Sequence, residues 1–188
     1  QFDRYTLQAN NNYTTHIWKA SYDLISKANL SIDSIPVIDM DESLQKRLLG
    51  EAKFLRALTY FNLVRLFGGV PLVLHPETDI DAYLVPRAEA EQVYDQILLD
   101  LEDAVASLPS SYGSTDKGRA TRGAALGILS KVYLTLQEWE LAAEMAGKVM
   151  EIPVYGLWED FTDNFKEGNK NGKESVFEVQ FQSEGQAE

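Results

Sequence analysis

The feature that most constrains the fold is the stretch GEAKFLRALTYFNLVRLFGGVPLV at residues 50–73. It continues a helical pattern that we predict over residues 42–67. Successive residues of a helix point about 100° apart, so the apolar and aromatic side chains fall in three sectors: Phe54, Ala57, Leu58, Phe61 and Val64 in one, Ala52, Leu55, Leu63 and Leu66 in another, and Tyr60 and Phe67 in a third. A surface helix needs only one apolar stripe. This helix is therefore expected to be an inner member of a layered helical array, ended by Gly68 and prevented from continuing by Pro71.

Four further segments show helical spacing of apolar residues, and we predict helices over residues 13–30, 88–108, 122–136 and 139–151. Thr121 is a candidate N-cap for the fourth of the five helices.

The segment VFEVQF at residues 176–181 alternates apolar and polar side chains, which predicts a short strand. A lone strand is not stable, so we expect its partners elsewhere in the fold or in sequence outside this chain.

The last two predicted helices match the tetratricopeptide spacing in part. Leu129, Tyr133 and Ala142 stand where that repeat expects them. Leu126 and Ser130 occupy the places of its usual tryptophan and glycine, so an ordinary antiparallel helix pair remains the alternative.

We therefore predict a mostly α fold with tetratricopeptide-like helical pairs in a right-handed superhelical array, irregular loops and a short C-terminal strand. We expect residues 1–188 to form a single domain, with helical repeats over 13–151 and an irregular segment over 152–188.

Composition excludes several classes of function. The chain has 29 acidic and 17 basic residues and a net charge of −12, and no cluster of basic residues. This argues against nucleic acids and anionic membrane surfaces as partners. The chain has no cysteine, which excludes disulfide scaffolds, cysteine-ligated zinc and thiol nucleophiles.

Motifs for catalysis or metal binding are weak. The two histidines, His16 and His75, lie far apart in sequence, and there is no Gly-x-Ser-x-Gly motif or phosphate-binding loop. The acidic segments 77–81 and 160–167 do not match a calcium loop. Glycoside hydrolysis needs two suitably spaced carboxylates, and nothing singles out such a pair. We expect no enzyme activity, no metal and no cofactor.

Five ordered blocks resemble the SusD/RagB family over about residues 13–182. They are the 50–73 motif; Trp18, Tyr22, Ile25, Ala28 and Asn29; VPRAEAEQVYDQILLDLEDAVASLP; GRATRGAALGILSKVYL with Trp139 and Ala142; and Asn171 with ESVFEVQF. The resemblance implies the N-terminal, tetratricopeptide-like part of a longer protein.

Members of that family are surface lipoproteins of the outer membrane that bind glycans or other nutrients without cleaving them. They deliver the nutrient to a TonB-dependent transporter. The resemblance implies the same polysaccharide or oligosaccharide ligand, partner and location here, although the lipid-bearing cysteine and signal are not in this chain.

Glycan binding needs an exposed aromatic ring beside amides or carboxylates, because sugars offer C–H faces and hydroxyls. The segment before the first helix has this composition, and the family places a Trp and an Asn of its glycan site near here. We therefore predict ligand binding by Asn10, Asn12, Tyr13 and Trp18. Trp18 also shares a helix stripe with Tyr22 and Ile25, which favours a core position for it.

Two alternatives stay open. One is a protein–protein interaction domain of tetratricopeptide type, which needs a groove lined by helix residues; the other is a glycan-cleaving enzyme. We expect Glu51 and Arg56 of the long motif to fix helix packing, since buried charges need partners.

Overall fold

The computed structural model of the chain describes residues 11–76 and 84–180, and these are mostly helical, as predicted. They divide into two compact units, one ending at Asp100 and one beginning at Leu101. The boundary falls within α3 (Ala90–Ser107), so each half of that helix belongs to a different unit. Within the described residues the only β pairing is an isolated bridge between Pro71 and Arg87.

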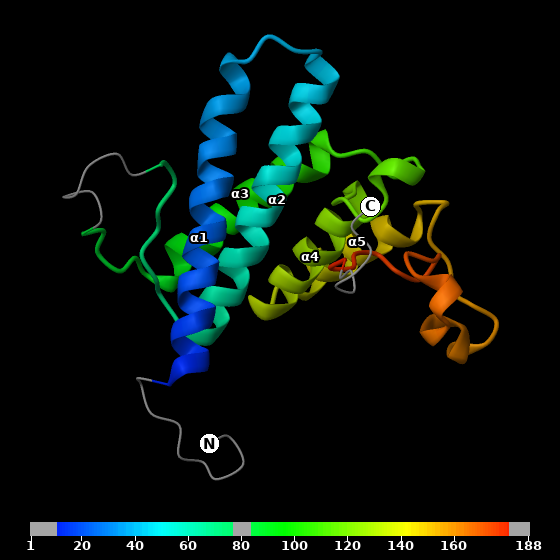
Figure 1. Cartoon of the computed structure of the whole chain (residues 1–188). Helices are drawn as coiled ribbons and strands as arrows, with labels where there is room; N and C mark the ends of the chain where they lie inside the picture. The colour runs from blue at the N-terminus through cyan, green and yellow to red at the C-terminus, as the bar shows by residue number, and fades with distance from the viewer. Residues whose placement is uncertain (1–10, 77–83, 181–188) are drawn as a thin grey trace. The chain divides into compact units, whose positions relative to one another are not determined.

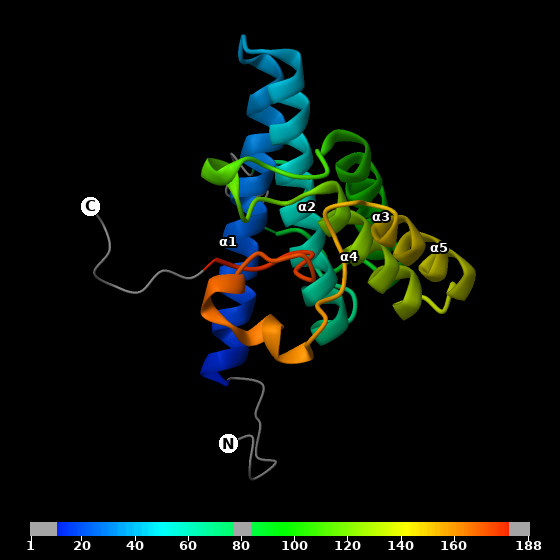
Figure 2. The same ribbon diagram turned by 90° about the vertical axis from the view of Figure 1, so that its right-hand side faces the viewer.

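The first unit is built on an antiparallel hairpin of two long helices, α1 (Asn12–Ser34) and α2 (Glu42–Phe67), which lie side by side in both views (Figures 1 and 2). A short 3-10 helix, η2 (Ile35–Val37), begins the connection between them. Asp41 caps α2 by accepting a hydrogen bond from the Leu44 N–H. Gly68 ends α2 with a φ of 72°, the left-handed conformation that its lack of a Cβ allows.

The core of the first unit confirms that α2 is an inner helix. The fully buried side chains of α2 come from three sectors of the helix and include Phe54, Tyr60, Phe61 and Leu63, and α1 adds Ile25. The first half of α3 adds Val93 and Ile97, both fully buried, and the Tyr94 ring meets the edge of Phe61 at 6.4 Å between centroids.

The second unit contains the helical pair α4 (Arg122–Thr135) and α5 (Trp139–Met150), which pack against each other. Thr121 is the N-cap of α4, as predicted, and accepts a hydrogen bond from the Ala124 N–H. The Ser130 hydroxyl donates to the Ala142 carbonyl at 2.8 Å across the pair. The two helices therefore approach closely enough for a direct bond between a side chain of one and the backbone of the other.

The rest of the second unit is irregular. It contains the short 3-10 helices η4 (Ser114–Asp116), η5 (Phe161–Phe165) and η6 (Glu167–Asn169). The predicted strand is wrong for the part that the structure describes, because residues 176–180 make no ladder with any described segment. Alternation alone does not make a strand where no neighbouring backbone lies alongside to pair with it. Residue Phe181 lies outside the described residues.

Candidate functional site

The start of α1 holds two of the four residues predicted to bind ligand. Asn12 is the first residue of the helix and is exposed, and the Tyr13 side chain is 69% exposed. Asn11, which is buried, caps the helix by accepting a hydrogen bond from the Tyr13 N–H at 2.8 Å. This cap fixes the start of the helix, and it therefore also fixes the backbone position of Tyr13. Asn10 lies outside the described residues.

Trp18 lies in a cluster of rings within the first unit. Its ring centroid is 5.0 Å from that of Tyr22 and 5.1 Å from that of Phe67, the latter in an edge-to-face arrangement. Part of the Trp18 side chain remains accessible. It lies five positions after Tyr13 on the helix, which turns the two side chains about 140° apart around α1. The helix therefore does not present them on one face.

The loop after α2 is held against the hairpin by side chains of the long motif and of α1. The Tyr22 hydroxyl donates to the Pro71 carbonyl at 2.8 Å, and the Asn29 amide donates to the Val73 carbonyl at 2.9 Å. The Tyr60 hydroxyl lies 2.8 Å from both the carbonyl and the N–H of Val73, donating to the first and accepting from the second. Burial raises the pKa of Tyr60 to about 12, and burial likewise raises that of Tyr22.

Arg56 has a structural role, as predicted. Its guanidinium makes two hydrogen bonds of 2.7 Å to the Asp100 carboxylate, and both side chains are almost fully buried. It also donates to the Asn29 amide oxygen at 2.9 Å. Glu51 lies 3.7 Å from Arg47 on the same helix, and its role in packing between helices stays a prediction. Asp100 was not identified from sequence, because only the fold brings it to Arg56.

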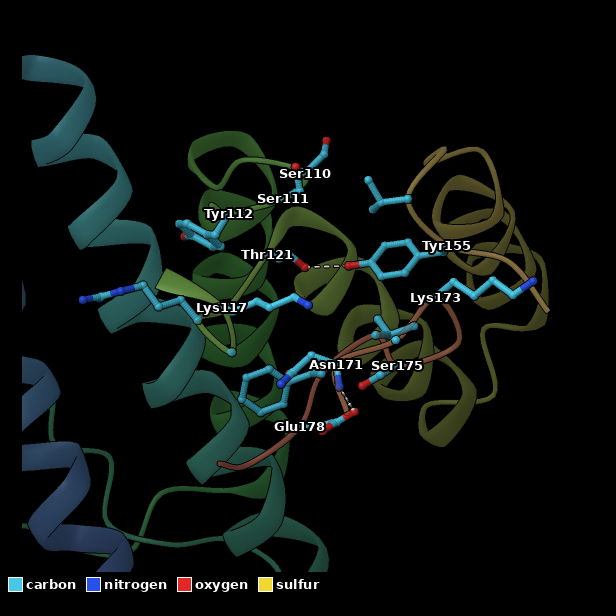
Figure 3. A pocket seen from close by; sticks show the side chains of 16 residues that line it. Ser110, Ser111, Tyr112, Lys117, Thr121, Tyr155, Asn171, Lys173, Ser175 and Glu178 are labelled. Atoms are coloured by element: carbon cyan, nitrogen blue, oxygen red, sulfur yellow. Dashed lines mark hydrogen bonds between the residues drawn. The ribbon is translucent and has the colours of Figure 1, made fainter. Parts of the chain in front are cut away.

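The second unit contains a pocket of about 290 Å³ (Figure 3). Three segments line it: the loop before α4, the start of the irregular segment, and residues 171–178. The lining residues are Ser110, Ser111, Tyr112, Lys117, Gly118, Arg119, Thr121, Val154, Tyr155, Asn171, Gly172, Lys173, Ser175, Val176, Phe177 and Glu178.

Hydrogen bonds fix the walls of this pocket. The Thr121 and Tyr155 hydroxyls lie 2.8 Å apart, and the Asn171 N–H donates to the Glu178 carboxylate at 2.9 Å (Figure 3). The Tyr155 ring also packs tightly on Gly123, where an added Cβ would lie 2.3 Å from it. Asn171 adopts a φ of 52°. The Asn-Gly pair at 171–172 is the signal by which sequence alone could have located this turn.

One exposed aromatic pair lies in the irregular segment. Phe161 and Phe165 are 74% and 76% exposed and face each other in an edge-to-face arrangement, with centroids 5.3 Å apart. Sequence analysis did not single them out. Large exposed rings are uncommon on protein surfaces, so this pair is a second exposed aromatic group beside Tyr13.

Two features are absent from the described residues: a group of metal-binding side chains and a membrane-spanning helix. No three His, Asp or Glu side chains in residues 11–76 and 84–180 are grouped so that they could hold a metal ion. Of the helices that the structure describes, none combines the length and apolar character needed to cross a bilayer.

Comparison with protein families finds one match that covers most of the chain. Residues 1–134 match the family SusD-like_3, described as "Starch-binding associating with outer membrane". A SusD-like protein of Bacteroides ovatus is 31% identical over 195 residues, which cover 96% of this chain and 35% of that protein. The chain thus spans about a third of the length of this relative.

Solved structures agree with this match. A SusD-like protein from Bacteroides fragilis is 35% identical, with a TM-score of 0.87 over 95% of this chain and 36% of that one. A structure named as a laminarin-binding SusD-like protein is 34% identical, with a TM-score of 0.82 over 86% of this chain and 36% of that one. Another, solved with a xylogluco-oligosaccharide, is 30% identical, with a TM-score of 0.82 over 91% of this chain and 36% of that one.

Proposed function

The chain belongs to the SusD-like family, and from that membership we propose that it binds a glycan, or another nutrient, at the cell surface without cleaving it. The observation that carries the proposal is the similarity to a structure named as laminarin-binding, at 34% identity and a TM-score of 0.82. A second relative of the same fold was solved with a xylogluco-oligosaccharide. The ligand class that follows is a neutral plant, algal or storage polysaccharide.

The start of α1 is the place where we propose the glycan binds. Tyr13 offers an exposed ring, and Asn12 beside it offers an amide, which is the pairing that a sugar's C–H face and hydroxyls require. Asn10 and Trp18 belong to the predicted set, but Trp18 lies on another face of α1 from Tyr13, so we propose Asn12 and Tyr13 as the centre of the site. The contribution of Trp18 is limited to the part of its ring that Tyr22 and Phe67 leave accessible.

Affinity electrophoresis tests this proposal. The chain is run in native gels that contain starch, laminarin or xyloglucan, and we expect one of them to retard it. Tyr13→Ala should abolish most of the retardation, because it removes the exposed ring. Trp139→Ala is the matched control, since Trp139 is an exposed ring at the start of α5 in the other unit. Equal retardation of both variants would contradict the proposed location.

We further propose that the nutrient passes to a TonB-dependent transporter, and that the α1–α2 hairpin offers the contact face. Exposed apolar side chains gather there: Ile17 and Leu24 on α1, and Leu55 and Leu66 on α2. Ile17 and Leu24 line a shallow depression with Thr59 and Asn62, which share a face of α2 with Leu55 and Leu66. Grouped apolar side chains on a surface mark protein contacts more often than single ones do.

The same face supports the second candidate function, a protein-interaction domain that binds no glycan. Co-purification separates the two. If Leu66→Glu abolishes the binding of a transporter-sized membrane partner while glycan retardation is unchanged, the chain has both activities. If the partner binds and no glycan in the panel does, the interaction domain is the correct function.

A further inference from the structure

The pocket of the second unit differs in charge from the chain as a whole. The chain has a net charge of −12. The charged residues that line the pocket are three cations, Lys117, Arg119 and Lys173, and one anion, Glu178. Asp116 pairs with Arg119, and Glu174 interacts electrostatically with Lys173, so two of the three cations have acidic neighbours just outside the lining.

Two of the three cations already have partners. The Arg119 guanidinium lies 2.8 Å from the Asp116 carboxylate, and the Lys173 ammonium lies 4.7 Å from the centroid of the Trp158 ring. Lys117 makes no ion pair or hydrogen bond with any residue that the structure describes. Figure 3 shows its side chain extending toward Thr121 and Tyr155. Its ammonium is thus the charge in this pocket that is open to a ligand.

Neutral hydrogen-bonding groups line the same pocket as that ammonium. Ser110, Ser111 and Ser175 bring hydroxyls to the lining, and the linked Thr121 and Tyr155 hydroxyls keep lone pairs for a further donor. Hydroxyls both donate and accept, so they suit a ligand that carries several hydroxyls of its own. The volume of about 290 Å³ is at the lower end of the roughly 300–1,000 Å³ usual for small-molecule sites. It therefore suits a single ring better than a long chain.

We propose that this pocket binds a sugar acid, with the ligand carboxylate on Lys117 and its hydroxyls on the serines and the Thr121–Tyr155 pair. The site is separate from the one proposed at the start of α1. It lies in the other unit, shares no residue with that site and does not require that the chain take up a neutral polysaccharide.

Calorimetric titration of the chain with D-glucuronate and D-glucose tests the site at low ionic strength. We expect glucuronate to bind at least fivefold more tightly, and the difference to shrink as salt is added, because salt screens an exposed charge pair. Lys117→Gln should bring the two affinities together. Lys170→Gln is the matched control: it removes an exposed lysine of the second unit that is not in the pocket lining.

Two further ligands define what the site recognises. Inorganic phosphate should bind more weakly than glucuronate; equally tight binding would overturn the sugar component of the proposal. If an oligogalacturonide binds as tightly as free galacturonate, the site takes the end of an acidic glycan. If the oligogalacturonide binds more weakly, the ligand of the site is a free sugar acid. The proposal is wrong if glucuronate does not bind, binds no better than glucose, or is unaffected by Lys117→Gln. The glycan proposal at the start of α1 is tested independently. Lys117→Gln should leave the retardation of the chain by starch, laminarin or xyloglucan unchanged.

Discussion

Arg56 joins three segments of the first unit through one buried guanidinium. It binds Asp100 on α3 and Asn29 on α1, and it also donates to the Leu74 carbonyl at 3.2 Å. Removing one partner of such a pair leaves an uncompensated buried charge, which costs about 3–5 kcal/mol. We therefore expect Arg56→Ala to lower the free energy of unfolding by that amount, as measured by urea denaturation.

The matched control is Lys46→Ala, which removes an exposed lysine paired with Glu42 at 2.6 Å on the same helix. Exposed pairs contribute about 0–1 kcal/mol, so this change should have little effect. The double variant Arg56→Met/Asp100→Leu should be more stable than the sum of the single losses predicts, because it leaves neither charge buried alone. A loss below about 1 kcal/mol for Arg56→Ala would contradict this role.

Tyr60 makes stability depend on pH in the alkaline range. Burial raises its pKa to about 12, whereas an unfolded tyrosine ionises near pH 10. Its contribution is therefore complete below pH 10 and declines between pH 10 and 12, by up to about 3 kcal/mol. Urea denaturation at pH 8 and pH 11 should show this decline.

Tyr60→Phe should be less stable than the parent chain at pH 8, because the backbone of Val73 loses both bonds to the hydroxyl. The variant should lose less stability on going to pH 11. Some decline should remain, since burial also raises the pKa of Tyr22. An identical decline in both proteins would show that Tyr60 ionises at its ordinary pKa.

Two helix glycines of the second unit have opposite surroundings. A Cβ on Gly123, in α4, would lie 2.3 Å from the Tyr155 ring, whereas a Cβ on Gly147, in α5, would meet nothing within 4 Å. Gly147→Ala should raise the melting temperature, since alanine favours a helix by about 0.5–1 kcal/mol over glycine. Gly123→Ala should lower it, because overpacking costs about 1–3 kcal/mol. Thermal denaturation of both variants checks the contrast, and equal effects would contradict it.

Helices with local stop and start signals were predicted well from sequence. The bounds of α2 were predicted correctly, because Asp41 caps its start and Gly68 ends it. The first helix was predicted to end at residue 30 but continues to Ser34, since no glycine or proline interrupts residues 31–34 and the first proline is Pro36. The strand at 176–181 was a wrong prediction within the described residues, because strands depend on partners that a local pattern does not reveal.

Sites assembled from distant segments were less predictable. Arg56 was identified as a packing residue, but its partner is 44 residues away, at a distance where helical spacing gives no guidance. The pocket draws on three loop segments, and its open cation, Lys117, has no motif around it. Whether Asn10, Asn12, Tyr13 and Trp18 form a glycan site remains a prediction, as does the single domain. The family, by contrast, was recognisable because five blocks occur in order along the chain.

At the scale of the whole molecule, the central claim is that the chain holds a glycan and leaves it intact. Equilibrium dialysis against short oligosaccharides of starch, laminarin and xyloglucan tests it most directly, with chromatography of the saccharide afterwards. The account predicts that one of them accumulates on the protein side and is recovered at its original length. Shorter products would show that the chain is an enzyme, and equal distribution of every saccharide would show that it binds none of them.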